Sequence, residues 1–444
     1  MTIQEILYLF LIFLSGLLTV NLLIKELTWQ EHLGLSFLVG FGNHSVLYFI
    51  FVLRMGLPLQ NNLVFLICET VLLILFTYVL KKKTKHVSFP KEKGKVKYLK
   101  TFLLLISGFV LLYTFLQCIY WPVHTPDAIY LYDFRAKLLL RGNLDRFFGG
   151  ISFYFNQLYP PFTSLMHFFL YQTGAENPKI YYALIFIALY LVIVGYVKRI
   201  TKSTFLGLLA GTLTILTPSI WWNSTLASTN ITLTAYISIA TLYLFDPTDK
   251  NTYFGNAILG AMLLGFSAWT RIEPFWMVIA FLVFIKNIFR LKIKNLLIFF
   301  AIILPLSYLW PSSVITPPTL SAPTPISIIK TEVYRIKLVT NTNSIETIKY
   351  FSHPLYESWG IVLPLFFGVL FAEIVFMKKS VFWIQISTLA LTLTTIYAII
   401  SFSTAFAGWA GLRDSVYRMA TMTIPLYWVN IIKSNAWKKF NQFI

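Results

Sequence analysis

Long apolar runs, each separated from the next by a short polar or charged stretch, make up most of the chain. A membrane-spanning α-helix needs about 20 mostly apolar residues, so the pattern predicts an all-α polytopic membrane protein with about 13 transmembrane helices. We predict them over residues 5–24, 33–53, 62–80, 101–118, 179–197, 203–218, 227–245, 254–269, 274–289, 295–311, 356–377, 381–404 and 417–433.

Two further apolar runs, residues 138–144 and 162–171, are too short to cross a bilayer. We predict that both form juxtamembrane helices that lie on the membrane interface. Tyr159-Pro160-Pro161 precedes the second run, and proline fixes its own φ and favours an extended residue before it. This triplet is therefore expected to be a rigid entry to the second juxtamembrane helix.

The composition agrees with this class of protein. Hydrophobic residues make up 57% of the chain and charged residues only 12%, whereas about 25% is usual in soluble domains. Cys68 and Cys118 lie in apolar runs without metal-ligand spacing, so we expect packing roles rather than a disulfide or a zinc site. The first apolar run has no basic residue before it and no cleavage site after it, and it is expected to be a true span rather than a signal peptide.

The net charge of +19 is explained by orientation in the membrane. The densest basic run, residues 81–97, is predicted to be cytoplasmic because Lys and Arg concentrate in cytoplasmic loops. It is expected to be a solvated linker that touches anionic lipid headgroups, and no nucleic-acid partner is predicted. Alternation of the spans then places the N-terminus outside, the C-terminus inside, and residues 119–178 on the external face.

The stretch from Trp121 to Lys137 holds most of the candidate chemistry. Its ionisable residues are His124, Asp127, Asp133, Arg135 and Lys137. Asp127 follows the fourth predicted span, at the height where a general base could take a proton from an acceptor hydroxyl. The alternative is that Asp127 caps a short helix that begins at Ala128.

Cations near the external face are candidates for binding a phosphate, Arg through a bidentate fork and Lys as a point charge. The candidates are Arg135, Lys137, Arg271 and Arg418. Their alternatives are snorkelling to lipid headgroups and ion pairs with Asp133, Asp145, Glu273 or Asp414. Glu69 and Glu373 lie inside predicted spans and are expected to be hydrogen-bonded across helices. His124 and His353 do not predict a metal site.

Three motifs occur in a set order on the predicted external face. They are Pro126-Asp127-Ala128 with the segment Tyr132 to Lys137, then Tyr159-Pro160-Pro161, then Thr270-Arg271-Ile272-Glu273-Pro274. This order resembles the GT-C superfamily of polytopic glycosyltransferases, in particular its protein O-mannosyltransferase and aminoarabinose transferase branch. The resemblance covers about residues 100–435. Ala128 stands where a second carboxylate would follow Asp127, and Pro274 stands where the family has Gly.

The resemblance implies a division of the chain and a set of roles. Residues 1–80 would be additional transmembrane helices, 81–100 a cytoplasmic linker, 101–435 a GT-C-like catalytic domain and 436–444 a cytoplasmic tail. Within the domain, 119–178 would be the first external loop and 311–356 an external lid-like loop. Asp127 would be the catalytic base, with Arg135, Lys137, Arg271 and Arg418 near the donor phosphate; His124, Asp133, Tyr159 and Glu273 would line the site.

The implied activity is transfer of a sugar from a polyprenyl-phosphate donor, with inversion, to an external protein, lipid or glycan acceptor. The protein would lie in the plasma membrane, in contact with its lipids, with the active site outside. No cofactor is implied with certainty, and a divalent metal is an open alternative. Two other functions stay open: an O-antigen-type polymerase or ligase that uses a diphosphate-linked donor, and a non-enzymatic transporter of a lipid or solute.

Overall fold

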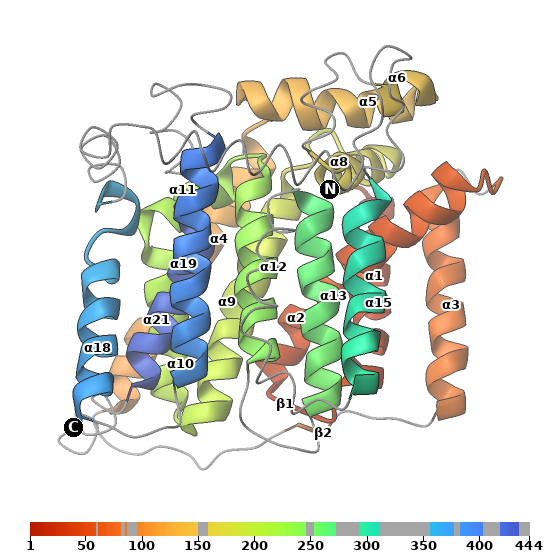
Figure 1. Cartoon of the computed structure of the whole chain (residues 1–444). Helices are drawn as coiled ribbons and strands as arrows, with labels where there is room; N and C mark the ends of the chain where they lie inside the picture. Colours follow the sequence, from red (N-terminus) through yellow and green to blue (C-terminus); the bar gives the residue numbers. More distant parts are fainter. Residues whose placement is uncertain are drawn as a thin grey trace.

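The computed structural model describes residues 1–58, 61–80, 85–86, 96–149, 159–245, 253–271, 293–310, 356–376, 382–402 and 418–434. It is a bundle of helices that run in alternating directions, with shorter helices across one end (Figure 1). The long helices are α1 (Ile3–Leu23), α2 (Trp29–Tyr48) with the π-helical turn η1 (Phe49–Arg54), α3 (Asn62–Leu80), α4 (Val96–Tyr120), α9 (Ile180–Thr201), α10 (Thr204–Leu216), α12 (Thr229–Leu244), α13 (Tyr253–Thr270), α15 (Ile293–Leu309), α18 (Val362–Phe376) and α19 (Phe382–Phe402).

Short elements complete the bundle. They are the π-helical turn η2 (Ala128–Asp133), α5 (Phe134–Leu140), α6 (Leu144–Gly149), α8 (Phe162–Gln172), α11 (Pro218–Thr225), the 3₁₀ turn η5 (Ala420–Thr423) and α21 (Ile424–Lys433). Among the described residues, β-structure is limited to a parallel pair of two-residue strands, β1 (Glu26–Leu27) and β2 (Lys85–His86). The helices α5, α6 and α8 lie across one end of the bundle, called here the α5–α8 end (Figure 1).

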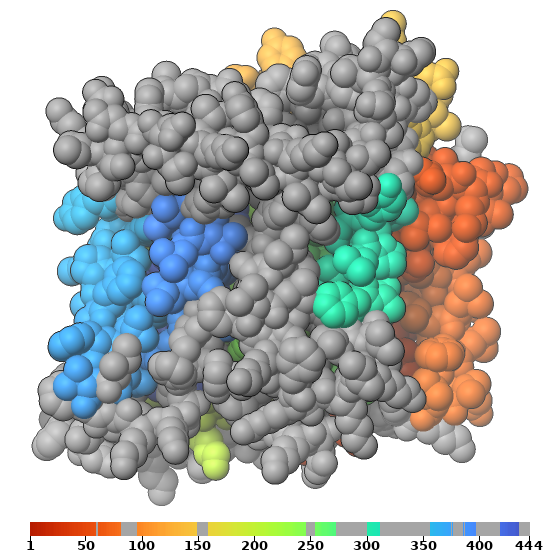
Figure 2. Space-filling view, in the orientation of Figure 1, coloured from red at the N-terminus to blue at the C-terminus, as the bar shows by residue number. Residues whose placement is uncertain are grey.

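The membrane class is confirmed by the length and composition of the helices. Within the described residues, five helices are long and apolar enough to cross a bilayer, and a sixth is added if α10 and α11, which meet at a bend of 65°, count as one span. Figure 2 shows α3, α15, α18 and α19 along one flank of the molecule. On α3 and α18, large apolar side chains such as Leu72, Phe76 and Phe371 are exposed, as a lipid-facing surface requires.

Helices occupy all but one of the predicted spans; residues 274–289 lie outside the described residues. The number of about 13 spans stays a prediction, because among the described residues the length-and-composition criterion is met by α1, α2 with η1, α3, α4 and α9, and by α10 with α11 if they count as one span. The second short run forms a helix as predicted: α8 begins at Phe162, directly after Pro161. The single helix predicted over residues 138–144 is wrong, because α5 ends at Leu140, α6 begins at Leu144, and the residues between them are not helical. That these helices lie on a membrane interface stays a prediction.

The N-terminal helices pack closely against the rest of the bundle. A Cβ atom added at Gly16 of α1 would lie 1.8 Å from the backbone oxygen of Ser36 on α2, and one added at Gly34 would lie 2.6 Å from the backbone oxygen of Ala188 on α9. Only glycine permits helix backbones to approach this closely. α1 and α2 therefore form one packed unit with α9.

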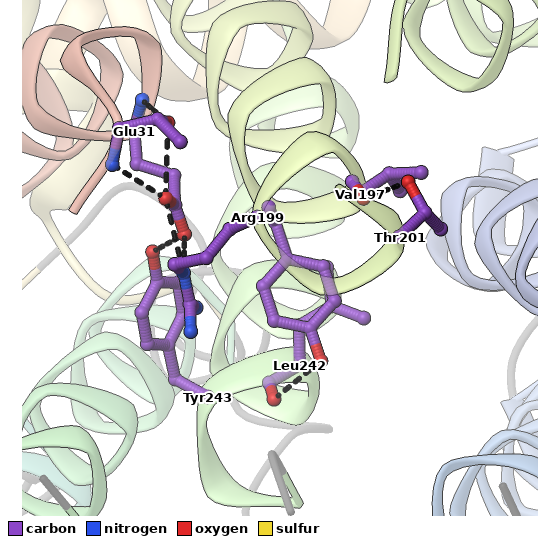
Figure 3. Close-up of polar contacts among 8 residues, drawn as sticks. Glu31, Val197, Arg199, Thr201, Leu242 and Tyr243 are labelled. Atoms are coloured by element: carbon purple, nitrogen blue, oxygen red, sulfur yellow. Dashed lines mark hydrogen bonds and ion pairs between the residues drawn. The ribbon is translucent and has the colours of Figure 1, made fainter. Parts of the chain in front are cut away.

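A buried ion pair joins α2 and α9 at the end of the bundle opposite the α5–α8 end (Figure 3). Glu31 of α2 is fully buried and accepts hydrogen bonds from Arg199 Nε of α9 (3.0 Å) and Tyr243 Oη of α12 (2.8 Å). It also accepts from the backbone N–H of Thr28 (2.9 Å), which completes a capping box at the start of α2. The carboxylate is therefore satisfied by three helices at once.

Candidate functional site

Asp127 and Arg418 form an ion pair at the α5–α8 end, although 291 positions separate them in the sequence. Asp127 directly precedes η2, and Arg418 lies two residues before η5, which leads into α21. Both side chains are partly exposed, 41% for Asp127 and 38% for Arg418. The backbone of Asp127 is helical and its side chain makes no capping bond to η2, so the capping alternative is wrong.

Arg135 of α5 is a buried cation without a carboxylate among the described residues. Its side chain is 2% exposed, and Nη1 donates to the backbone oxygen of Tyr159 at 2.7 Å. The guanidinium also lies 4.7 Å from the ring centre of Trp310 and 5.2 Å from that of Phe147. Its Nε and Nη2 are buried and have no hydrogen-bond partner among the described residues.

This environment is unfavourable for a charge. Burial lowers the pKa of Arg135 from its usual 12.5 to about 9. Buried guanidinium nitrogens without acceptors carry a desolvation cost that an anionic ligand would remove. The predicted ion pairs of Arg135 with Asp133 or Asp145 are not present in the part of the chain that the structure describes.

Tyr159 links Arg135 to a second predicted cation. Its backbone oxygen accepts from Arg135, and its ring centre lies 5.5 Å from the guanidinium carbon of Arg271, which follows α13. Arg271 is 5% exposed, and its Nη1 lies 3.3 Å from Oδ1 of Asn230 on α12. Asn230 in turn donates to Asn223 of α11 at 2.9 Å. Two of the predicted phosphate-binding arginines therefore meet at the predicted site-lining tyrosine.

Tyr132 of η2 fills the space beside these groups. It is 3% exposed, its ring packs edge-to-face on Tyr159 at 6.0 Å, and its hydroxyl lies 3.3 Å from Oγ1 of Thr229. Burial, with the nearby Tyr159 and Asp127, raises the pKa of Tyr132, whereas Arg271 opposes the rise. Tyr132 therefore remains a neutral hydroxyl close to Asp127, Tyr159 and Arg271.

Asp133 belongs to a separate cluster on the neighbouring face of the same segment. Its carboxylate pairs with Lys137 Nζ at 2.7 Å, accepts from the Tyr171 hydroxyl, and lies 3.4 Å from His167 Nδ1. Burial alone would raise the pKa of Asp133, but hydrogen bonds from His167, Lys137 and Tyr171 outweigh it and hold the pKa at about 2. Burial also lowers the pKa of His167. This cluster fixes α5 on α8.

Lys137 is accordingly placed differently from Arg135. Its side chain is 54% exposed and is engaged by Asp133, so the alternative of an ion pair with Asp133 is confirmed for Lys137. His124 is exposed, with Nδ1 3.1 Å from the backbone oxygen of Pro122. Glu273, His353, residues 311–355 of the predicted lid-like loop and the tail 436–444 lie outside the described residues, as does most of the linker 81–100.

Comparison with protein-family models, curated proteins and solved structures finds no match to this chain. The GT-C resemblance therefore stays a prediction. The described site contains one partly exposed carboxylate, three arginines and two tyrosines at one end of the bundle. No group of three His, Cys, Asp or Glu side chains suited to a metal ion occurs within the described residues.

The structure adds site residues that the sequence did not single out. Tyr132, Asn230 and Trp310 contact the predicted residues directly, and Thr229 contacts Tyr132. The polar run from Thr217 to Thr234, between two apolar segments, is a signal that could have indicated Asn223 and Asn230. Trp310 carried no comparable signal, because aromatic residues make up 18% of the chain.

Proposed function

We propose that the protein is a membrane glycosyltransferase that moves a sugar from a polyprenyl-phosphate donor to an external protein, lipid or glycan acceptor. The single observation that carries the proposal is the buried guanidinium of Arg135, which has two nitrogens without a partner among the described residues and lies in a site that also holds Arg271 and Arg418. Such nitrogens favour an anionic ligand. A phosphate attached to a lipid fits a cationic site at the end of an apolar bundle.

Asp127 is the proposed general base. As it takes the proton of the acceptor hydroxyl, the acceptor oxygen bonds to the anomeric carbon from the face opposite the phosphate. The bond between the anomeric carbon and the phosphate oxygen breaks, so the configuration inverts and the lipid phosphate departs with its electron pair. Arg418 holds the carboxylate in place, and a guanidinium, with five N–H donors, can contact a carboxylate and a phosphate together.

The three arginines stabilise the departing phosphate, which gains negative charge in the transition state. The phosphodiester of the donor carries one negative charge, and a second develops as the bond to the sugar breaks. Donors that are already oriented therefore act more strongly on the transition state than on the ground state, and this is the source of the rate enhancement. Arg135 is oriented by Tyr159 and by stacking on Trp310, so it needs little reorganisation when the charge develops.

The charge distribution supports an external site. Lys198, Arg199, Lys202 and Lys433 lie at or near the end of the bundle opposite α5, α6 and α8. Because Lys and Arg concentrate on the cytoplasmic side, the α5–α8 end is assigned to the outside of the plasma membrane. The acceptor is then an external molecule.

The test is donor consumption by the purified full-length protein in lipid nanodiscs, with a panel of polyprenyl-phosphate sugars. Slow hydrolysis of a donor by the wild type, lost in Asp127→Asn and kept in Asp145→Asn, supports the proposal; Asp145 is an exposed carboxylate of α6 in the same layer. Equal hydrolysis by Asp127→Asn would remove Asp127 as the base. Consumption of diphosphate-linked donors alone would favour the polymerase or ligase, and binding without consumption of either would favour a transporter.

A further inference from the structure

A buried carboxylate and a buried imidazole meet inside the N-terminal helices, away from the site described above. Glu69 of α3 is 6% exposed and His44 of α2 is fully buried, and His44 Nδ1 lies 3.0 Å from Glu69 Oε2. Ser15 of α1 donates to Glu69 Oε1 at 2.6 Å. At about 1.5 Å per residue, Glu69 lies about 10 Å into α3 and Ser15 about 18 Å into α1, within the apolar part of both helices.

Among the residues that the structure describes, no further charged group compensates the pair. His44 packs on Phe65, Phe169 and Tyr48, with its ring centre 4.6 Å from that of Phe169. The other titratable groups facing the pair are phenols: Tyr8 on α1, Tyr48 on α2 and, beside Tyr8, Tyr181 on α9. No Lys or Arg pairs with Glu69 in the part of the chain that the structure describes.

Two polar atoms beside the pair lack partners. If His44 Nδ1–H donates to Glu69, the other ring nitrogen, Nε2, either accepts a hydrogen bond or carries a second proton. Nε2 is buried and has no partner among the described residues, and the same is true of the Tyr8 hydroxyl. The ring of Tyr8 lies 5.8 Å from that of His44. Buried polar atoms without partners indicate an unfilled place for a proton or a water molecule.

We propose that Glu69 and His44 form an intramembrane proton-binding site. With one proton shared by the two groups, either as imidazolium and carboxylate or as two neutral groups, the pair has no net charge. Loss of that proton leaves a negative charge in the bilayer, and gain of a second leaves a positive one. Because an uncompensated charge at this depth is costly, the two groups share this proton and exchange it as a unit rather than separately.

One proton can move between Glu69 and His44 without any other reactant. The O–H bond of a neutral Glu69 breaks as the Nδ1–H bond of His44 forms, and Ser15 stabilises the resulting carboxylate. The proposal is independent of glycosyl transfer, because none of these residues belongs to the site of Asp127. Ionisable groups inside spans mark proton or ion sites more often than they serve packing alone.

The experiment is infrared difference spectroscopy of the full-length protein in lipid nanodiscs as the pH is stepped between about 5 and about 8, where imidazoles change charge. We expect a carboxyl C=O band that changes with pH and is lost in Glu69→Gln. Glu373→Gln is the matched control, because Glu373 is also buried in a span but bonds the uncharged Gln385 at 3.2 Å. An unaltered difference spectrum in Glu69→Gln overturns the proposal.

Two further variants keep the outcome clear. His44→Gln removes the proton partner, so the Glu69 carboxyl should remain protonated across the whole range; a wild-type titration there contradicts a shared site. If Glu69→Gln does not fold, Ser15→Ala retains both titrating groups. Loss of the bond to the charged carboxylate should move the midpoint to higher pH, and an unmoved midpoint argues against the assignment.

Discussion

Replacement of Arg135 by Met should make the ligand-free protein more stable while it weakens binding of a phosphate. Burial lowers the pKa of Arg135 from 12.5 to about 9. A drop of about 3.5 pH units, at about 1.4 kcal/mol each, corresponds to about 5 kcal/mol against the charged folded form. Because the folded-state pKa is the lower one, this cost is fully present below about pH 9 and is relieved as the pH rises toward 12.5.

Favourable contacts of Arg135 offset part of this cost. The bond to the Tyr159 oxygen contributes about 2 kcal/mol and the two aromatic faces together about 2 kcal/mol. A methionine of similar length fills the space without a charge. Arg135→Met should therefore raise the free energy of unfolding by about 1 kcal/mol, which is a rise in Tm of a few degrees at most.

The assay is thermal unfolding of the full-length protein in detergent, with and without farnesyl phosphate, and with farnesol as the uncharged control. For the wild type, a ligand at 100 times its Kd adds about 2.7 kcal/mol. Arg135→Met should lose most of this increment, whereas Arg141→Met, at an exposed arginine that follows the same helix, should change neither value. A lower ligand-free Tm together with a full response to farnesyl phosphate would refute the reasoning.

Three other predictions concern stability. Asp133→Asn should lower the free energy of unfolding by about 2 kcal/mol above pH 4, because the folded protein holds the pKa of Asp133 at about 2 instead of 3.8. This part of the stability is present at neutral pH and is lost as the pH falls from about 4 to about 2. If Tm falls with acid in the variant as it does in the wild type, the prediction is contradicted. Glu31→Gln should cost about 3 kcal/mol because it leaves Arg199 without its buried anion; Glu31→Gln combined with Arg199→Met should recover part of the Tm. Gly16→Val should abolish folding of α1 against α2, seen as loss of monodisperse protein in size-exclusion chromatography, because the added atoms would overlap Ser36.

Much of the architecture could be predicted because membrane helices are selected by length and apolar composition. The boundaries of α1, α3, α9, α10 and α19 agree with the predicted runs to within a few residues. The bend between α10 and α11 could not be read from hydropathy, although Pro218 marks it. Hydropathy also does not say which helix packs on which, so the contact of α1 and α2 with α9 came only from the structure.

The candidate site, too, could be predicted from the sequence only in part. The predicted topology places Asp127 and Arg418 on the same side of the membrane. Their ion pair, however, depends on the packing of helices whose residues are 291 positions apart in the sequence. Arg135 and Lys137 were given the same role, although positions two apart on a helix point about 200° away from each other. The periodicity alone could therefore have separated a buried Arg135 from an exposed Lys137.

The positions of Asp127 and Arg135 explain why a site of this kind can be both oriented and open. Asp127 is held by one arginine from the far end of the chain and stays partly exposed, so an acceptor hydroxyl can reach it. Arg135 is held by Tyr159 and Trp310, but two of its nitrogens have no partner in the part of the chain that the structure describes, so they can receive an anion without breaking any bond seen there. Because the free protein bears the cost of that buried charge, binding of a phosphate should recover free energy at the place where the leaving group develops its charge. Donor binding should therefore raise the stability of the protein, and Arg135 is the residue through which it does so.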